Sequence, residues 1–484
     1  MHFVRLVSLA MTVIVIAASL SHIDCANHTP KDRLVESGVA AMEEGDMEAA
    51  VRALKAATDL INLDTPDSND TYIFVNLGTA LGEIGQAALS AAQYRKAIDV
   101  DGENVDAHYF LGLTLQDMGR NREAADTYAV AASLDRMHWE SMSNLGAVLL
   151  DLTDYSGSVA AFSEAIGTLE QREVEPTNAP YDPFPILSQL YYRRGMALSG
   201  GSSGGNRGGV CVVQAQSDDP GGKDVDCGEM AKFSFSKAVS YDEGNEAAKH
   251  MLAALTADAT MKRASNSYVK GLFDEYAGNF EHSLVVDLGY KGFQLLRNFV
   301  GEVLGEENLK FGLVVDAGCG TGLIGNEFRG VSRTLVGMDL SKKIIDEAKI
   351  KRPGLYDRTY VGDIVEGIRA EGGKIDLVIA ADSFIYFGDL GALFESIRDG
   401  LRRGGYVAFT LEDVGMEDAR ILDSERPDWR WKLTPSGRFA HRKGYIEDVL
   451  KASGFVLVGY GAMENFRYEN GVGVMGHMLV ARKV

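Results

Sequence analysis

The chain has 484 residues, of which 46% are apolar and 24% charged, a composition typical of globular proteins and a length that suits two or three domains. Its 48 basic and 69 acidic side chains give a net charge of −21. Because nucleic-acid binding relies on clustered Lys and Arg, and no dense run of them occurs, we expect no DNA or RNA partner.

The cysteines are few and form no C-x-x-C pair, so the sequence indicates no metal site. Cys211 and Cys227 bracket a segment rich in Gly and Ser, and either a bridge between them or two free thiols is compatible with the sequence. Cys319 lies between two glycines, where a small residue is needed, and we interpret it as structural.

The first residues, 1–23, have the pattern of a targeting segment. Arg5 precedes an apolar run at 6–20, which suits the core of a signal peptide better than a membrane-spanning helix. This predicts a signal peptide or signal anchor and a place in the secretory pathway or endoplasmic reticulum. Residues 6–20 would anchor the chain in a membrane only if they are not cleaved, and a cytoplasmic location is the alternative.

Residues 31–258 contain a repeat of 34 residues, seen in the spacing of Gly78, Gly112 and Gly146. A unit of this length, with small residues where two helices cross, is the tetratricopeptide pattern, which predicts an α-helical solenoid. We expect a fifth unit split by a flexible Gly/Ser-rich loop at 200–228. A capping helix is expected at 246–255, followed by a linker at 259–270.

Such solenoids present a concave groove to a protein or peptide, so the repeats predict a partner of that kind. Asn76 and Asn144 stand at equivalent positions two residues before the repeat glycine. Their amides could hold a peptide backbone in the groove, but local hydrogen bonding is the interpretation we favour.

Residues 313–322 read Leu-Val-Val-Asp-Ala-Gly-Cys-Gly-Thr-Gly and combine an apolar strand with a glycine loop. The β-branched run with no polar alternation is typical of a strand covered on both faces of a parallel sheet. Glycines at every second position after Asp316 let a ligand approach the backbone, where N–H groups of a following helix would favour an anion.

Three more apolar runs each lead to a carboxylate, at Asp339, Asp363 and Asp382. The carboxyl ends of parallel strands form the edge at which open α/β sheets bind ligands. We therefore expect a small-molecule site at this edge, with Asp339 placed to bind a ribose. A closing antiparallel pair of strands is expected at 455–460 and 471–482.

Taken in order, Asp-Ala-Gly-Cys-Gly-Thr-Gly at 316–322, Asp339, Gly362-Asp363 and Ile375-Asp-Leu-Val resemble the motifs of class I S-adenosylmethionine-dependent methyltransferases. The segments at 272–280 and 437–441 are similar to methyltransferases that carry tetratricopeptide repeats. The resemblance implies that a solenoid is followed, at 271–484, by an α/β Rossmann-like domain with a mostly parallel, seven-stranded sheet.

A dinucleotide-binding enzyme is the nearest rival, because residues 320–325 satisfy the pattern G-x-G-x-x-G. That fingerprint follows its strand directly, whereas Asp-Ala-Gly-Cys intervenes here. We therefore favour S-adenosylmethionine as the cofactor.

The resemblance also implies the contacts of the cofactor. The glycine loop takes its amino-acid end, with Asp316 near the ammonium group, and Asp339 accepts from both ribose hydroxyls. Asp363 accepts from the adenine amino group, with Ile364 against the ring. For each carboxylate the alternative is a helix cap at the surface. The complete expected set is Asp316, Gly318, Cys319, Gly320, Gly322, Asp339, Leu340, Asp363, Ile364 and Asp382.

The methyl acceptor is expected over the loop that begins at Asp382, which carries no Asn-Pro-Pro-Tyr motif for methylation of an amide or adenine nitrogen. The expected substrate pocket consists of Tyr276, Ser383, Tyr386 and Arg438. His441, at the end of a long loop at 414–441, is the candidate general base, although a lone histidine more often has a structural role.

The sequence thus predicts an S-adenosylmethionine-dependent methyltransferase whose repeats recruit a protein partner or substrate. One alternative is a repeat scaffold with a catalytically inactive methyltransferase-like domain. Another is a small-molecule methyltransferase in which the repeats only drive assembly. The methyl acceptor and the oligomeric state are not indicated by the sequence.

Overall fold

The computed structural model of the chain describes residues 29–62, 66, 70–174, 182–202, 210–211, 225–256, 258, 260–469 and 472–484. The chain divides after Asp242 into two compact units. The predicted targeting segment at 1–23 lies outside the described residues, as does most of the predicted loop at 200–228. Within the described part, no helix combines the length and the apolarity needed to cross a membrane.

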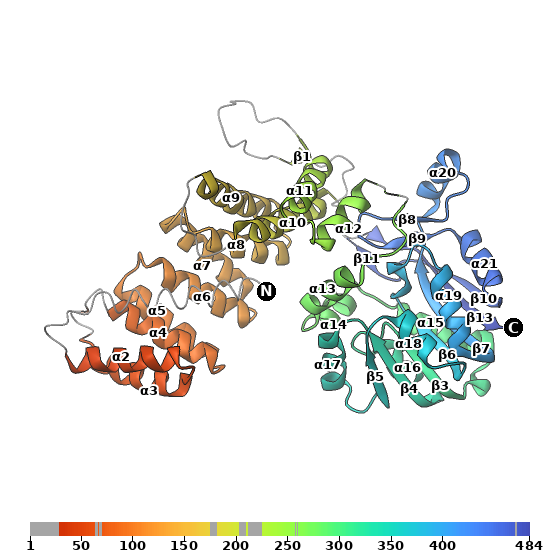
Figure 1. Cartoon of the computed structure of the whole chain (residues 1–484), viewed down its shortest axis with the longest axis horizontal. Helices are drawn as coiled ribbons and strands as arrows, with labels where there is room; N and C mark the ends of the chain where they lie inside the picture. Colours follow the sequence, from red (N-terminus) through yellow and green to blue (C-terminus); the bar gives the residue numbers. More distant parts are fainter. Residues whose placement is uncertain are drawn as a thin grey trace. The chain divides into compact units, whose positions relative to one another are not determined.

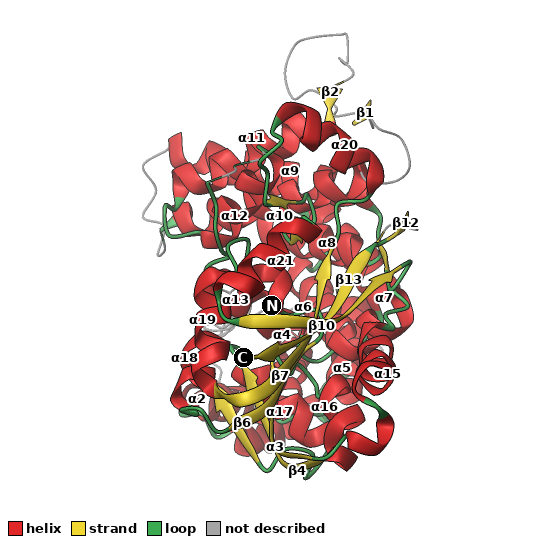
Figure 2. Cartoon of the chain, turned by 90° about the vertical axis from the view of Figure 1, so that its right-hand side faces the viewer, coloured by secondary structure: helices red, strands yellow, loops and turns green. Residues whose placement is uncertain are grey.

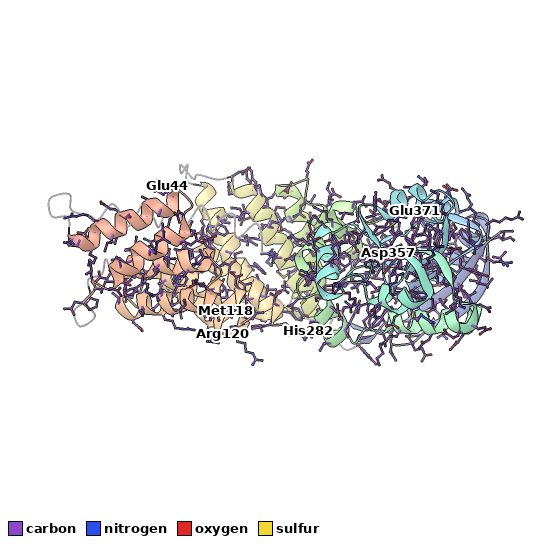
Figure 3. All side chains as sticks on the ribbon, turned by 90° about the horizontal axis from the view of Figure 1, so that it is seen from below. Glu44, Met118, Arg120, His282, Asp357 and Glu371 are labelled. Atoms are coloured by element: carbon purple, nitrogen blue, oxygen red, sulfur yellow. The ribbon has the colours of Figure 1, made fainter. Side chains whose placement is uncertain are left out.

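The first unit is helical, and helices that follow one another in the chain pack together (Figure 1). Its first four helices are α2 (Pro30–Glu43), α3 (Met47–Thr58), α4 (Asp70–Glu83) and α5 (Ala87–Val100). They are followed by α6 (Val105–Asp117), α7 (Asn121–Leu134), α8 (Trp139–Asp151) and α9 (Tyr155–Val174). The last two are α10 (Pro183–Ser202) and α11 (Cys227–Tyr241). Met118 and Arg120 mark the turn between α6 and α7 (Figure 3).

The glycine of the 34-residue frame lies where the two helices of a pair cross. A Cβ atom on Gly112 would lie 2.6 Å from the ring of Tyr128, and one on Gly195 would lie 2.6 Å from the ring of Phe235. The same contact joins Gly78 to Tyr94 and Gly146 to Phe162. In these four pairs the helices therefore cross at a distance that only glycine permits, with one aromatic ring filling the space, whereas Gly38 of the first pair meets Leu54 instead. Asn144 in α8 donates to the hydroxyl of Tyr109 in α6 (3.5 Å), which is a contact between helices and not the local hydrogen bond that we expected.

The boundary between the two units differs from the expected one. Helix α12 (Glu246–Leu255), predicted to cap the repeats, belongs to the second unit. The predicted linker is also part of that unit, because Arg263 forms a β-bridge with Phe387 and the N–H of Ala264 donates to the carbonyl of Tyr386 (2.9 Å). The pattern of an isolated helix does not reveal which of two cores it joins.

The segment between the two helices of the fifth pair is shorter than predicted, because α10 extends to Ser202 and α11 begins at Cys227. Between them, β1 (Val210–Cys211) pairs antiparallel with β2 (Val225–Asp226). Cys227 takes part in a disulfide. Cys319 of the second unit is free and buried.

The second unit is built on the predicted mostly parallel sheet (Figure 2). Its strands lie in the order β10-β13-β7-β6-β3-β4-β5. The parallel strands are β3 (Phe311–Ala317), β4 (Ser332–Asp339), β5 (Arg358–Val361), β6 (Ile375–Ala380) and β7 (Leu401–Glu412). The expected antiparallel pair is formed by β10 (Phe455–Met463) and β13 (Gly476–Lys483). The Rossmann-like prediction is therefore confirmed.

Helices cover both faces of this sheet. One core contains side chains of α15 (Gly292–Leu304) and α16 (Leu323–Phe328). The opposite core contains side chains of α18 (Ile364–Ala370), α19 (Gly391–Gly400) and α21 (Lys443–Ala452). Helix α17 (Lys342–Lys351) connects β4 to β5. Val314, Val315, Leu335 and Val336 are all buried, as expected for strands covered on both sides.

The predicted long loop at 414–441 is a folded insertion. It contains α20 (Met416–Glu425), β8 (Trp431–Leu433) and β9 (Phe439–His441). Strands β8 and β9 pair antiparallel, and β9 adds to β7 through the pair Ala440 and Glu412, so the sheet that the structure describes has nine strands where seven were expected. A smaller hairpin, β11 (Tyr468–Glu469) with β12 (Val472–Gly473), precedes β13. These short strands escape sequence analysis because two or three residues carry too little periodicity to detect.

Candidate active site

A cavity opens where the carboxyl ends of β3, β4 and β6 meet. Its space measures about 1000 Å³, including the part open to solvent. Strand β3 lies between β4 and β6, so the chain crosses from one side of β3 to the other at this point. This is the place at which open α/β sheets bind ligands. The predicted residues that line the cavity are Gly318, Cys319, Gly320, Asp339, Leu340, Ile364, Asp382, Ser383, Tyr386 and Arg438.

The glycine loop that follows β3 forms one wall of the cavity. Gly318 has a φ of +78°, and a Cβ atom there would lie 2.4 Å from the Cβ atom of Ser383. Gly320 has a φ of +52°, and the ring of Phe280 lies close above it. The loop therefore needs glycine for its conformation as well as for its contacts. Gly322 lies outside the cavity lining, where a Cβ atom would meet Leu355 at 2.6 Å.

Asp339, at the end of β4, joins the loop to the next helix. Its Oδ2 accepts from the N–H of Gly320 (3.0 Å) and its Oδ1 from the N–H of Ser341 (3.0 Å). Burial raises the pKa of Asp339 to about 6, although these hydrogen bonds act in the other direction. Each carboxylate oxygen keeps a second lone pair, so Asp339 can accept two more hydrogen bonds from a ligand in the cavity.

Asp316 lies below the loop, outside the cavity lining. Its Oδ2 accepts from the Tyr356 hydroxyl (2.6 Å), while its fully buried Oδ1 has no hydrogen-bond partner. Burial raises the pKa of Asp316 to about 7. A positive charge near the loop would therefore favour the ionised form of this buried carboxyl group.

Asp363 is not free to face a ligand in the way that the resemblance implies. Its Oδ2 accepts from Arg263 Nη2 (2.7 Å) and Asn266 Nδ2 (3.0 Å), and its Oδ1 caps α18 through the N–H of Val365 (2.8 Å). Asp363 does not line the cavity, but Arg263 and Asn266 do. The polar groups on this side of the cavity are therefore those two side chains, which come from the segment before α13 (Asn266–Tyr276) and from its first residue.

Two predicted residues lie outside the cavity lining. Tyr276, at the end of α13, is 49% exposed. His441 is completely buried, its Nε2 donates to the carbonyl of Gly388 (3.2 Å), and its ring stacks on Tyr445. Burial lowers the pKa of His441 to about 4. Its prediction as a general base is therefore wrong on position, because its ring faces the protein interior.

A network of buried charges supports the side of the cavity that carries Asp382. Arg467 is fully buried and contacts three carboxylates, those of Asp382, Glu412 and Glu469. Arg438, in the cavity wall, pairs with Glu469 as well. Burial raises the pKa of Glu412. Burial also acts on Glu469, but Arg438 and Arg467 outweigh it and hold the pKa of Glu469 below its usual value.

Sequence analysis missed several lining residues that come from the segments before β3. Phe273 belongs to α13, Leu284 to a π-helical turn, η1 (Ser283–Asp287), and Tyr290 to the connection that follows it. Phe280, which begins the short helix α14 (Phe280–His282), also lines the cavity. These aromatic residues gave no signal because their spacing is that of any amphipathic helix.

Comparison with known proteins shows that part of the second unit is similar in sequence to methyltransferases. Residues 314–405 match the family model described as "Methyltransferase domain". The magnesium-protoporphyrin O-methyltransferase of Rhodobacter capsulatus is 35% identical over 103 residues, 20% of this chain and 44% of that protein. The malonyl-[acyl-carrier protein] O-methyltransferase of Yersinia pestis is 29% identical over 115 residues, 24% of this chain and 42% of that protein. The chain thus spans less than half the length of these curated relatives.

Among solved structures, magnesium protoporphyrin IX methyltransferase from Synechocystis PCC 6803 with bound SAH is similar over 46% of this chain and 100% of that chain. The sequence identity is 18% and the TM-score 0.35. Residues 314–405 of the second unit are thus similar to a methyltransferase domain. The cavity fits S-adenosylmethionine, the cofactor that the sequence motifs imply, because the unpartnered Asp316 Oδ1 beneath the loop suits its positive charge and Asp339 keeps free lone pairs for its ribose.

Proposed function

We propose that this protein transfers the methyl group of S-adenosylmethionine to an acceptor bound in the cavity beside the glycine loop. One observation carries the proposal: the loop at 318–320 and the Asp339 carboxylate stand on the same cavity and are hydrogen-bonded to each other. A glycine-rich loop next to a ribose-binding acid is the arrangement that a nucleoside with a charged tail requires.

The tasks of the residues follow from their places. Asp339 holds the ribose hydroxyls, and the apolar side chains of Leu340 and Ile364 flank the adenine. Because Asp363 is already paired, the polar edge of the adenine faces Asn266 and Arg263. Asp363 then acts by holding these two side chains in place.

The acceptor occupies the part of the cavity next to Ser383, Tyr386 and Arg438. The cofactor supplies a methyl group on a sulfonium, so the protein's task is to align the acceptor and exclude water. The names of the curated relatives, both O-methyltransferases, favour an oxygen acceptor.

We propose further that the helix pairs of the first unit are tetratricopeptide repeats that recruit a protein or peptide partner. The recurring contact between a glycine and an aromatic ring, as at Gly112 and Tyr128, supports this assignment. The disulfide at Cys227 supports the secretory pathway as the location. A repeat scaffold with an inactive domain is the second candidate.

The test is calorimetric titration of the full chain with S-adenosylmethionine and S-adenosylhomocysteine, with a nicotinamide dinucleotide as the control ligand. We expect both sulfur ligands to bind, the dinucleotide to fail, and Asp339→Ala to lose most of the affinity. A folded wild-type chain that binds neither sulfur ligand would contradict the enzyme and leave the scaffold.

A further inference from the structure

The ring of Tyr290 is held rigidly at the cavity. Its centroid lies 5.9 Å from that of Phe293 and 6.1 Å from that of Phe466. The backbone on either side is fixed too, because the N–H of Tyr290 donates to Leu284 and that of Lys291 to Phe466. The side chain is only 3% exposed and lines the cavity. Its position is therefore set before any ligand binds.

The hydroxyl of Tyr290 has no hydrogen-bond partner in the part of the chain that the structure describes. A buried polar group without a partner destabilises the folded state, so such groups are rare and call for an explanation. Nothing in the packing of the ring requires a hydroxyl, because phenylalanine has the same shape. The hydroxyl is therefore available to form a hydrogen bond with a ligand in the cavity.

The charges around Tyr290 make the hydroxyl a donor. Burial and the nearby carboxylates of Asp382 and Asp316 raise its pKa well above the usual value, although Arg467 and Arg438 act in the other direction, so the proton stays in place. No hydrogen bond joins the hydroxyl to Asp382, whose Oδ1 is engaged by Arg467 Nη1 (2.6 Å). A ligand in the cavity would supply the missing acceptor.

The topology of the sheet indicates which part of the ligand this is. Asp339 ends β4 on one side of β3, and Asp382 follows β6 on the other side, with the glycine loop between them. A cofactor whose ribose binds Asp339 and whose tail crosses the loop brings its amino-acid end toward Asp382 and Tyr290. That end carries an ammonium group, which suits the unpartnered Asp316 beneath the loop, and a carboxylate, which suits a hydrogen-bond donor.

We propose that the Tyr290 hydroxyl donates a hydrogen bond to the α-carboxylate of the cofactor, which makes Tyr290 a binding residue for its amino-acid end. The inference rests on the proposed function, because it assumes that the cavity takes this cofactor. The connection before α15, which carries Tyr290, then helps the site to distinguish a complete cofactor from its nucleoside portion.

The experiment compares two ligands on the full chain by calorimetry: S-adenosylhomocysteine, and 5′-methylthioadenosine, which lacks the amino-acid end. Tyr290→Phe should weaken binding of the first roughly 10- to 100-fold, the loss expected for a hydrogen bond to a charged group. It should leave binding of the second within about twofold, since that ligand cannot make the bond. Equal losses for the two ligands, or no loss for either, would overturn the proposal. If the wild type binds neither ligand, the proposed function itself fails.

Tyr445→Phe is the matched control, because Tyr445 is a partnered tyrosine outside the cavity lining whose hydroxyl accepts from the N–H of Leu390 (2.9 Å). It should change neither affinity, but it should lower the melting temperature of the ligand-free protein by leaving that N–H unpaired. Tyr290→Phe should not lower it, because its hydroxyl has no bond to lose. A comparable drop in melting temperature for both variants would show a structural hydroxyl and contradict the assignment.

Discussion

Replacing Arg467 by methionine tests the buried charge network most directly. The guanidinium is completely buried and contacts Asp382, Glu412 and Glu469, while Arg438 is the other cation of the network. Methionine fills much of the same volume but leaves the three carboxylates with one cation. Breaking a buried ion pair from one side costs about 3–5 kcal/mol, so we expect the second unit to lose that much stability.

For a unit of this size each kcal/mol corresponds to about 2–4 °C, which predicts a fall in melting temperature of roughly 6–20 °C. The loss should shrink as the pH falls, because the unpaired carboxyl groups can then take up protons. The network is therefore expected to be most important at neutral and higher pH.

Urea unfolding followed by tryptophan fluorescence measures this loss. Trp429 and Trp431 lie in the second unit, so a Trp139→Phe background confines the signal to it. Arg358→Met is the control: Arg358 pairs with Glu371, labelled in Figure 3, but its side chain is 53% exposed, and such pairs contribute about 0–1 kcal/mol. An Arg467→Met variant no less stable than the control, or a loss that grows on acidification, would refute the reasoning.

Three further predictions concern the cavity and its surroundings. Because the folded-state pKa of Asp339 is raised to about 6, its contribution to ligand-free stability is present below about pH 4 and lost as the pH rises through 6. Ribose binding needs the carboxylate, so calorimetry should show cofactor affinity falling by at least about tenfold per pH unit below 6. Asp339→Asn should bind weakly and show a shallower fall, which is the part due to Asp316. His441→Asn should lower the free energy of unfolding by about 1–3 kcal/mol, seen as a lower melting temperature, yet leave the shape of the pH–rate profile unchanged. Loss of the limb near neutral pH would show that His441 does act as a base. A fragment of residues 243–484 should fold and bind the cofactor. The shorter fragment 271–484 should be less stable, because it lacks Ala264 and His250, the hydrogen-bond partners of Tyr386 and Gly437. Equal melting temperatures for the two fragments would contradict the boundary after Asp242.

The parts of the site that sequence analysis predicted are those fixed by local chemistry. The loop at 318–322 needs glycine at positive φ, and Asp339 follows a buried strand, so both are visible within a few residues of sequence. The role of Asp363 could not be read in this way, because Arg263, 100 residues earlier, captures its carboxylate. The same holds for α12, whose His250 donates to the carbonyl of Gly437 (2.7 Å), far away in the chain.

Arg467 shows most clearly which part of the site cannot be predicted from local sequence. It lies in a polar stretch, Asn-Phe-Arg-Tyr-Glu-Asn, that has the composition of an exposed turn, and yet its side chain is completely buried. Its partners Asp382 and Glu412 follow or end two different strands, and only the order of the sheet brings them together. Pairing of this kind depends on topology, which no local pattern encodes.

The acids at the carboxyl edge of the sheet therefore fall into two groups with different electrostatic states. Asp316 and Asp339 have no cationic partner, and burial raises the pKa of each, so a positively charged ligand would favour their ionised forms. Asp382, next to the proposed acceptor, is paired with Arg467.

On the proposed function this division has a catalytic consequence. Methyl transfer removes the positive charge of the sulfonium, so an unpaired carboxylate beside the reacting methyl group would stabilise the ground state more than the transition state. The unpaired acids are instead assigned to the ammonium and ribose, which keep their charge and hydrogen bonds throughout the reaction. Pairing Asp382 with Arg467 lets the edge bind a cationic cofactor without raising the barrier to methyl transfer.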